Sequence, residues 1–163
     1  MYHPLIGGTE YIELANTSAD SVPLFSNGFS WKVKGVSFEF PPNVTIKPNG
    51  VCLLIDISTS VSEFRLTNAI DSNVLIFQFD GKLSNDTEMV AIEKPGTIYY
   101  DANDIIQCPY ITVDAVSYKD SSPWPKAADG DGYSLIRKDL AAWGNEPSNW
   151  RASDLKGGTP GKL

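Results

Sequence analysis

Residues 31–40 have the sequence Trp31-Lys32-Val33-Lys34-Gly35-Val36-Ser37-Phe38-Glu39-Phe40. Apolar side chains stand at odd-numbered positions up to Val33 and at even-numbered positions from Val36 onward. Alternation with a period of two is typical of a β-strand with one buried face. Because an unbroken strand would send one of the two apolar sets to solvent, the change of parity predicts a turn or bulge at Lys34 and Gly35.

The same alternation recurs on both sides of this segment, and amphipathic helical windows are almost absent. Residues 10–16 place Ile12 and Leu14 on one face, and residues 51–57 are apolar on both faces, which is typical of a central strand. Further strands are expected at residues 44–46, 74–79, 87–93, 111–118 and 132–137. This pattern predicts an all-β fold, an antiparallel sandwich of two sheets.

One short helix is expected as an exception to the strand pattern. The alternation also predicts which side chains form the core. Residues 60–66 form the best helix candidate, with Ser60 as the N-cap and Glu63 at the capping-box spacing. The side chains expected to be nearly inaccessible are Ile12, Leu14, Phe38, Leu53, Ile55, Val90, Ile92 and Leu135.

Length and composition favour a single globular domain over residues 1–163. The chain is 42% hydrophobic, and a domain of this size buries roughly 70% of the surface that the unfolded chain exposes. The longest apolar run ends at Asp56, far short of the roughly 20 residues of a membrane-spanning helix. Residues 1–14 lack the pattern of a signal peptide, so any export signal is expected outside residues 1–163.

The charge distribution disfavours general binding to nucleic acid. The formal net charge is −7, whereas binding to phosphates rewards clustered Lys and Arg. Residues up to Tyr118 include six basic and 14 acidic side chains, and the rest of the chain has seven basic and six acidic ones. The C-terminal third is therefore weakly cationic, but too dilute in charge to predict a binding patch.

The chain offers little material for catalysis or metal binding. Its single histidine, His3, has no Gly-x-Ser-x-Gly elbow to support it, and no phosphate-binding loop occurs, so an enzyme is not expected. Cys52 and Cys108 are expected to be free thiols, with one disulfide as the alternative, and they cannot build a zinc site with His3. No cofactor is implied.

Residues 129–132 superficially resemble a calcium-binding loop. An EF-hand loop that starts at Asp129 needs a glutamate at its twelfth position, which is Leu140. A looser calcium site that uses Asp129 and Asp131 remains as an alternative, but a solvated turn is favoured because Asp and Gly are common turn formers.

Residues 97–110 form a Tyr-rich, acidic insertion between predicted strands, and residues 138–163 look irregular. Tyr99, Tyr100, Asp101 and Asp104 of the insertion are candidate binding residues, because binding surfaces often use Tyr-rich loops. Trp124, between two prolines, is a further candidate as an exposed aromatic platform. The favoured alternative for Trp124, and equally for Trp143 and Trp150, is packing against the sheets.

Motifs spread along the chain resemble those of the lamin tail domain, in the version found in secreted and surface proteins of bacteria. They are Tyr2-His3-Pro4, Glu10-Tyr11-Ile12-Glu13-Leu14, Asn16, Gly35-Val36-Ser37-Phe38-Glu39-Phe40-Pro41, Pro48-Asn49-Gly50, Leu83-Ser84-Asn85, Glu88, Val113-Asp114-Ala115-Val116-Ser117-Tyr118, Pro123-Trp124-Pro125, Asp131-Gly132-Tyr133-Ser134-Leu135, Pro147-Ser148-Asn149-Trp150-Arg151-Ala152-Ser153 and Gly158-Thr159-Pro160-Gly161. Their order and spacing together make the match specific. The resemblance implies an immunoglobulin-like β-sandwich and an extracellular or cell-surface location, but no shared catalytic residues.

These features predict a non-catalytic interaction or spacer module of a larger exported or cell-surface protein, with a protein or glycan partner. The first alternative is a carbohydrate-binding module that uses exposed aromatic side chains. The second is a nucleic-acid-binding module by analogy with nuclear relatives, which the negative net charge disfavours. The insertion at 97–110 is the first candidate for a functional surface, and its structural alternative is a segment that packs across one sheet edge and protects it.

Overall fold

The computed structural model describes all 163 residues, which form mainly short β-strands and a single α-helix. The strands are β1 (Tyr11–Ala15), β2 (Val22–Pro23), β3 (Phe25–Ser26), β4 (Phe29–Ser30), β5 (Lys32–Lys34), β6 (Phe38–Glu39), β7 (Thr45–Ile46), β8 (Val51–Asp56), β9 (Leu75–Phe79), β10 (Thr87–Pro95), β11 (Tyr99–Tyr100), β12 (Ile106–Gln107), β13 (Tyr110–Lys119), β14 (Leu135–Arg137) and β15 (Trp150–Ala152). The helix α1 spans Val61–Thr67, and two short 3₁₀ turns cover Lys126–Ala128 and Pro147–Asn149.

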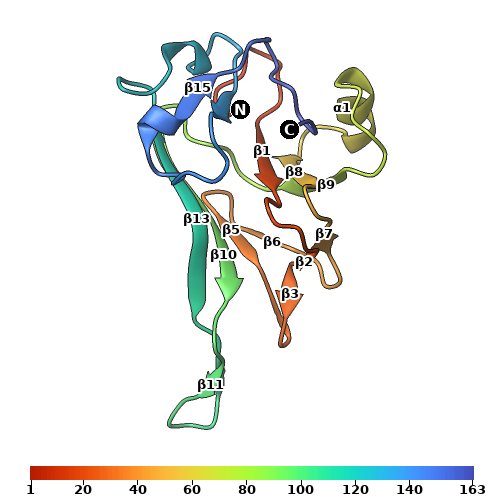
Figure 1. Cartoon of the computed structure of the whole chain (residues 1–163), viewed down its shortest axis with the longest axis vertical. Helices are drawn as coiled ribbons and strands as arrows, with labels where there is room; N and C mark the ends of the chain where they lie inside the picture. The colour runs from red at the N-terminus through yellow and green to blue at the C-terminus, as the bar shows by residue number, and fades with distance from the viewer.

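Two larger sheets organise the molecule (Figure 1). One has three strands in the order β1-β8-β9, and the other has four in the order β13-β10-β5-β6. The all-β expectation is confirmed, but the expectation of purely antiparallel pairing is wrong for β8 and β9, which run parallel. Parallel neighbours need a crossover connection, and the segment that contains α1 supplies it.

The change of parity in residues 31–40 marks a turn, as the sequence predicts. β5 and β6 pair antiparallel, with Lys32 opposite Glu39 and Val33 opposite Phe38. Gly35, in the connection, has a φ of 99°, a conformation that glycine adopts at little cost. The Lys32 Nζ lies 2.9 Å from a carboxylate oxygen of Glu39 across this pair.

The hydrophobic core is divided by β8, which is covered on both faces. Cys52 and Leu54 of β8 belong to the larger cluster, which also includes Val33 of β5 and therefore joins the two sheets. Leu53 and Ile55 face a smaller cluster that includes residues of the α1 region. The prediction of a central strand at residues 51–57 is thus confirmed.

The helix α1 lies beside β8 and β9 and begins as the sequence predicts. Ser60 is its N-cap, and the Ser60 Oγ accepts a hydrogen bond from the Glu63 backbone N–H at 3.4 Å. Phe64 is the helical residue that reaches the smaller cluster, where its ring lies 5.9 Å from that of Tyr11. No helix in the chain has the length and apolar character needed to cross a membrane.

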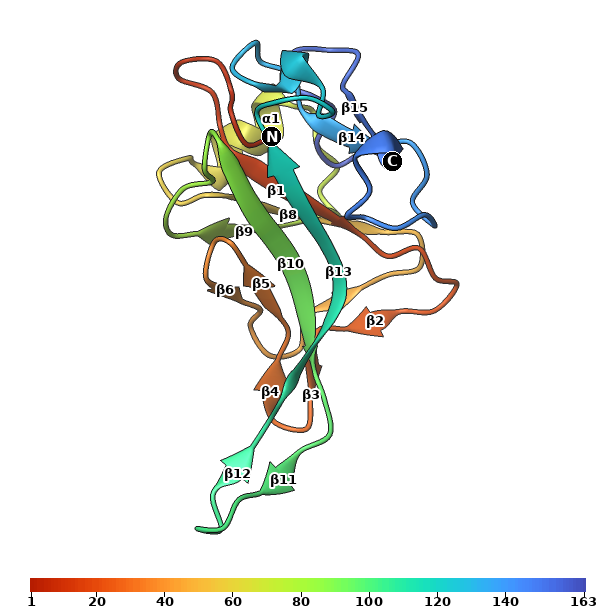
Figure 2. The same ribbon diagram turned by 90° about the vertical axis from the view of Figure 1, so that its left-hand side faces the viewer.

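Segments from the two ends of the sequence meet at the end of the molecule opposite β11, where both termini lie in Figures 1 and 2. The His3 Nδ1 lies 2.7 Å from an Asp129 carboxylate oxygen. The Tyr11 hydroxyl donates to the Gly157 carbonyl at 3.0 Å. Residues far apart in sequence therefore close this end of the fold.

The C-terminal segment is more regular than its composition suggests. The expectation of an irregular stretch from residue 138 onward is wrong for β15, which pairs antiparallel with β14. Arg137 of β14 lies opposite Trp150 of β15, and the guanidinium carbon sits 5.4 Å from the centre of the indole. This short ladder ties the last part of the chain to the rest of the molecule.

Candidate functional site

Residues 97–110 are here called the tip hairpin, and they project away from both larger sheets up to Tyr110, which begins β13 (Figure 2). β11 and β12 pair antiparallel and continue the long hairpin made by β10 and β13. The alternative in which this insertion packs across a sheet edge is therefore wrong. β11 and β12 stay side by side beyond the four-stranded sheet because the β10–β13 pairing continues as far as Pro95 and Tyr110.

The tip hairpin exposes large apolar side chains. Tyr99 and Tyr100 are 55% and 65% exposed, and Ile105 and Ile106 at the far side of the turn are also exposed. Tyr100 lies directly opposite Ile106, so these two side chains share one face, whereas Tyr99 shares the other face with Gln107. The structure thus gives Tyr99 and Tyr100 the accessibility that a binding role requires.

The two acidic candidate binding residues of the tip hairpin, Asp101 and Asp104, differ in their hydrogen bonding. The Asp101 Oδ1 accepts hydrogen bonds from the backbone N–H groups of Asn103 at 2.9 Å and Ile105 at 3.0 Å, and its Oδ2 accepts one from Gln107 Nε2 at 2.9 Å. These bonds, led by the one from Ile105, hold the pKa of Asp101 below its usual range. Asp101 therefore shapes the turn, while Asp104, at a φ of 57°, has an exposed carboxylate without an ion pair.

Acidification is expected to loosen this turn without unfolding the domain. Because the pKa of Asp101 is lowered in the folded state, its carboxylate stabilises the turn above the unfolded pKa of about 3.9, and this contribution is lost as the pH falls through the folded pKa. The ¹⁵N relaxation of Asn103 and Ile105 should report the loss of order. In Asp101→Ala the turn should be mobile already at neutral pH, with an unchanged melting temperature. A turn in that variant that stays as ordered as in the wild type would contradict this role.

A second feature is the inter-sheet groove, which opens between β1 of one sheet and β10 and β13 of the other. It has a volume of about 1160 Å³, and 27 of the 39 residues that line it are hydrophobic. Its walls include Ile12 and Leu14 of β1, Val90 and Ile92 of β10, and Val116 of β13. Together with Trp143 at the rim, these side chains define the inter-sheet groove.

The inter-sheet groove corrects the expected core. Leu53 and Ile55 are fully buried as predicted, but the other six expected core residues are only partly buried. Those six are Ile12, Leu14, Phe38, Val90, Ile92 and Leu135. Five of them line the groove, so the face that alternation assigned to the core remains partly open to solvent between the sheets.

The outer backbone edge of β1 borders the groove. It is paired at Tyr11, which exchanges two hydrogen bonds of 3.0 Å with Met1, and it is open further along the strand. The Asn16 N–H donates to the Gly50 carbonyl at 2.9 Å, so in this antiparallel pair the even-numbered residues of β1 bond to β8. The N–H and C=O groups of Glu13 and Ala15 consequently point to the other side, where β1 has no neighbouring strand. An open edge of this kind can pair with an added strand.

The C-terminal segment covers part of the groove, and the tryptophans differ in their exposure there. Trp124 is only 6% exposed and packs with its ring 6.2 Å from that of Trp150, so Trp124 as an exposed platform is wrong and the packing alternative is confirmed. The Trp150 Nε1 donates to the Gly144 carbonyl at 2.7 Å. Trp143, for which packing was expected, is 64% exposed at the groove rim.

Most charged groups that line the groove already have partners. An Arg137 guanidinium nitrogen lies 2.6 Å from an Asp114 carboxylate oxygen, and Arg151 lies 2.9 Å from Asp154. The Glu13 carboxylate accepts a hydrogen bond from the Gly161 N–H at 2.6 Å, while burial raises its pKa. Lys162 also lines the groove and forms no ion pair.

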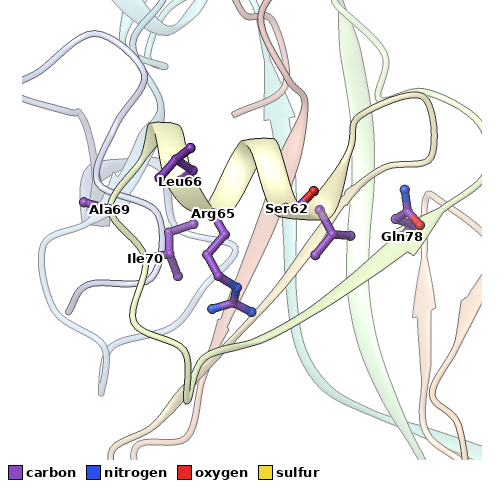
Figure 3. Close-up of a pocket in the computed structure, with 7 residues that line it drawn as sticks. Ser62, Arg65, Leu66, Ala69, Ile70 and Gln78 are labelled. Atoms are coloured by element: carbon purple, nitrogen blue, oxygen red, sulfur yellow. The ribbon is translucent and has the colours of Figure 1, made fainter.

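A third feature is a depression between α1 and β9 (Figure 3). Its volume is about 830 Å³, and its lining includes Arg65 and Leu66 of the helix and Gln78 of the strand. The Arg65 side chain donates to the Val74 carbonyl at 2.8 Å, and Gln78 Nε2 donates to the Thr59 carbonyl at 2.8 Å. Because these polar groups serve the protein's own backbone, the depression offers little to a ligand.

The remaining candidates have structural partners. Asp129, proposed as part of a loose calcium site, binds His3, and Asp131 is exposed. No group of three or more His, Cys, Asp or Glu side chains is arranged to hold a metal ion. Cys52 and Cys108 are both free, as expected, and burial raises the pKa of the Cys52 thiol to about 12.

Comparison with known proteins adds no assignment. No family model, no curated protein and no solved structure matches the chain.

Sequence reasoning located the tip hairpin but missed the groove. The groove residues have the same alternation as core residues, and only the placement of β1 and β13 at sheet edges leaves them accessible. One local signal was present: the run Leu140-Ala141-Ala142-Trp143 is apolar within a polar stretch and lines the rim.

Proposed function

We propose that this chain is a non-catalytic interaction module whose contact surface is the tip hairpin. The observation that carries the proposal is the exposure of Tyr99, Tyr100, Ile105 and Ile106 on a hairpin that projects from the body. Contiguous exposed apolar side chains mark interaction sites, and tyrosine supplies a large contact area at a low cost in side-chain entropy. No residue is assigned a catalytic role.

We further propose that the domain is immunoglobulin-like and related to the lamin tail domain of secreted and surface proteins. The sequence motifs support this assignment, and the shared core between a three-stranded and a four-stranded sheet is compatible with a sandwich. An extracellular or cell-surface location, as one module of a larger protein, follows from the same resemblance.

A protein partner fits the tip hairpin better than a glycan. Sugar-binding surfaces need several aromatic faces in a row or around a groove. Adjacent Tyr99 and Tyr100 point to opposite faces of their strand, Trp124 is buried, and Trp143 stands alone at the groove rim. The exposed Ile105 and Ile106 add aliphatic surface, which suits a protein contact.

Replacement of residues 97–110 by a short Gly/Ser linker tests the proposal. The tip hairpin lies outside both hydrophobic clusters, and its Tyr110 hydroxyl donates one hydrogen bond to the Ser30 carbonyl at 3.1 Å. The variant is therefore expected to keep its melting temperature within a few degrees. It should lose a protein partner that the wild type retains in a pull-down. Ile57→Asp, a change at an exposed isoleucine outside the tip hairpin, serves as the matched control and should bind normally. Unfolding of the linker variant, or binding that survives the replacement, would contradict the assignment.

A further inference from the structure

We propose that the tip hairpin of one copy of this chain docks along β1 of a second copy and fills its inter-sheet groove, which joins the copies head to tail. The inference rests on the proposed function of the tip hairpin as a contact surface and names its partner. Three independent features of the chain support it: the apolar surfaces, the backbone edges and the charges.

The two surfaces are both apolar. At about 1160 Å³ the groove exceeds the roughly 300–1,000 Å³ of pockets for small molecules, so a polypeptide segment suits it better. Tyr100 and Ile106 form one apolar face at the end of the projecting hairpin. Aliphatic walls such as Leu14 and Val116, with Trp143 at the rim, offer a matching environment.

The backbone edges also match. In β1 the N–H and C=O groups of Glu13 and Ala15 face outward beside the groove. In the tip hairpin the Asp101 N–H donates to the Ile105 carbonyl, so the backbone groups of Asp101 face β12. Because direction alternates along a strand, the N–H and C=O of the preceding residue, Tyr100, face the outer edge of β11. Pairing of these two edges adds a strand to the three-stranded sheet and places alternate side chains in the groove.

One basic side chain of the groove suits the acidic tip hairpin. The tip hairpin carries Asp101 and Asp104, and no Lys or Arg occurs between Lys94 and Lys119. The groove is lined by three acidic and three basic side chains, and Arg137 and Arg151 are already paired with Asp114 and Asp154. Lys162 lines the groove without an ion-pair partner, so it is available to an acidic hairpin. Such complementarity favours encounter and fixes orientation.

The arrangement requires a second copy. The tip hairpin points away from the body, whereas the groove lies between the sheets of the body, so a chain cannot fill its own groove (Figure 2). Each copy then offers one hairpin and one groove, which makes the contact heterologous. Unless the rotation between copies closes a ring, association continues beyond the dimer.

Sedimentation velocity over a range of protein concentrations tests the inference with two complementary variants. Ile106→Asp puts a charge on the apolar face of the tip hairpin. Ala15→Pro removes the outward N–H of the β1 edge, and it leaves the bonds to β8 in place because that N–H does not face β8. Ile57→Asp is the matched control, and Trp143→Asp at the exposed rim replaces Ala15→Pro if the proline variant does not fold.

The wild type and the Ile57→Asp control are expected to show mass that rises with concentration beyond a dimer, and high salt should weaken this association. Each single variant should associate at least about tenfold more weakly, in the manner of a lost hot spot. A mixture of the tip variant with the groove variant should recover a 1:1 complex, because one supplies an intact groove and the other an intact hairpin. That complementation is specific to a hairpin-in-groove contact.

A wild type that stays monomeric at all concentrations would overturn the inference, and so would variants that fail to complement each other in the mixture. These outcomes are distinct from failure of the proposed function. If the wild type is a monomer and the Gly/Ser replacement of residues 97–110 abolishes binding to another protein, the tip hairpin is still a contact surface, but its partner is a different protein.

Discussion

Replacement of Leu53 by alanine is expected to lower the free energy of unfolding by about 2–5 kcal/mol. Leu53 has no exposed area and lies in β8, between β1 and β9. The truncation deletes buried methyl groups and so loses the free energy gained by their burial. It also leaves a cavity, because the neighbouring strands on both sides of β8 prevent the structure from collapsing into the space. Urea denaturation with a fixed m value measures the change.

Leu66→Ala is the matched control for this experiment. Leu66 is 82% exposed on α1, so the same chemical change should alter the free energy of unfolding by less than about 0.5 kcal/mol. A loss below about 1 kcal/mol in Leu53→Ala would place β8 at a surface of the protein in solution and would contradict its central position.

Replacement of Asn16 by alanine is expected to cost about 2–4 kcal/mol, through hydrogen bonds rather than packing. The Asn16 Nδ2 donates to the backbone carbonyls of Asp20 at 2.7 Å, Ile46 at 3.1 Å and Lys47 at 3.0 Å. Its Oδ1 accepts from the Ser18 N–H at 3.0 Å. Alanine leaves these groups without their partner, and the bond to Ile46 is fully buried.

Asn16→Asp sharpens the test, because aspartate has the shape of asparagine but cannot donate. A carboxylate that faces three carbonyl oxygens is repelled by them, so Asn16→Asp should destabilise the fold at neutral pH at least as much as Asn16→Ala. Asn73→Ala, at an exposed position, should change little. Full stability of Asn16→Asp would show that the amide donors of Asn16 contribute nothing.

Local structure was largely predictable from the sequence. The turn at Gly35, the central strand at residues 51–57 and the cap at Ser60 each follow from residue types within a few positions. Strand direction was not predictable in the same way. The parallel pairing of β8 with β9 depends on where the crossover through α1 returns the chain, and alternation is the same in parallel and antiparallel neighbours at this length.

Of the two candidate surfaces, the tip hairpin was predictable from the sequence and the inter-sheet groove was not. Exposure of Tyr99 and Tyr100 could be predicted because the tip hairpin is a local feature with an unusual composition. The inter-sheet groove could not, because Leu14 and Val116 look like core residues in sequence, and their access to solvent arises only when two sheets assemble with β1 and β13 at their edges. The burial of Trp124 likewise depends on its contact with Trp150, 26 positions further along the chain.

The junction between the first and last segments of the chain has a consequence for how fast the protein folds. The contact of His3 with Asp129 spans 126 positions, and that of Tyr11 with Gly157 spans 146. The β10–β13 hairpin can form outward from its own turn. The contacts between the first and last segments can form only after almost the whole chain has folded. Since loop closure over such separations slows the search, this domain should fold in milliseconds to seconds rather than microseconds.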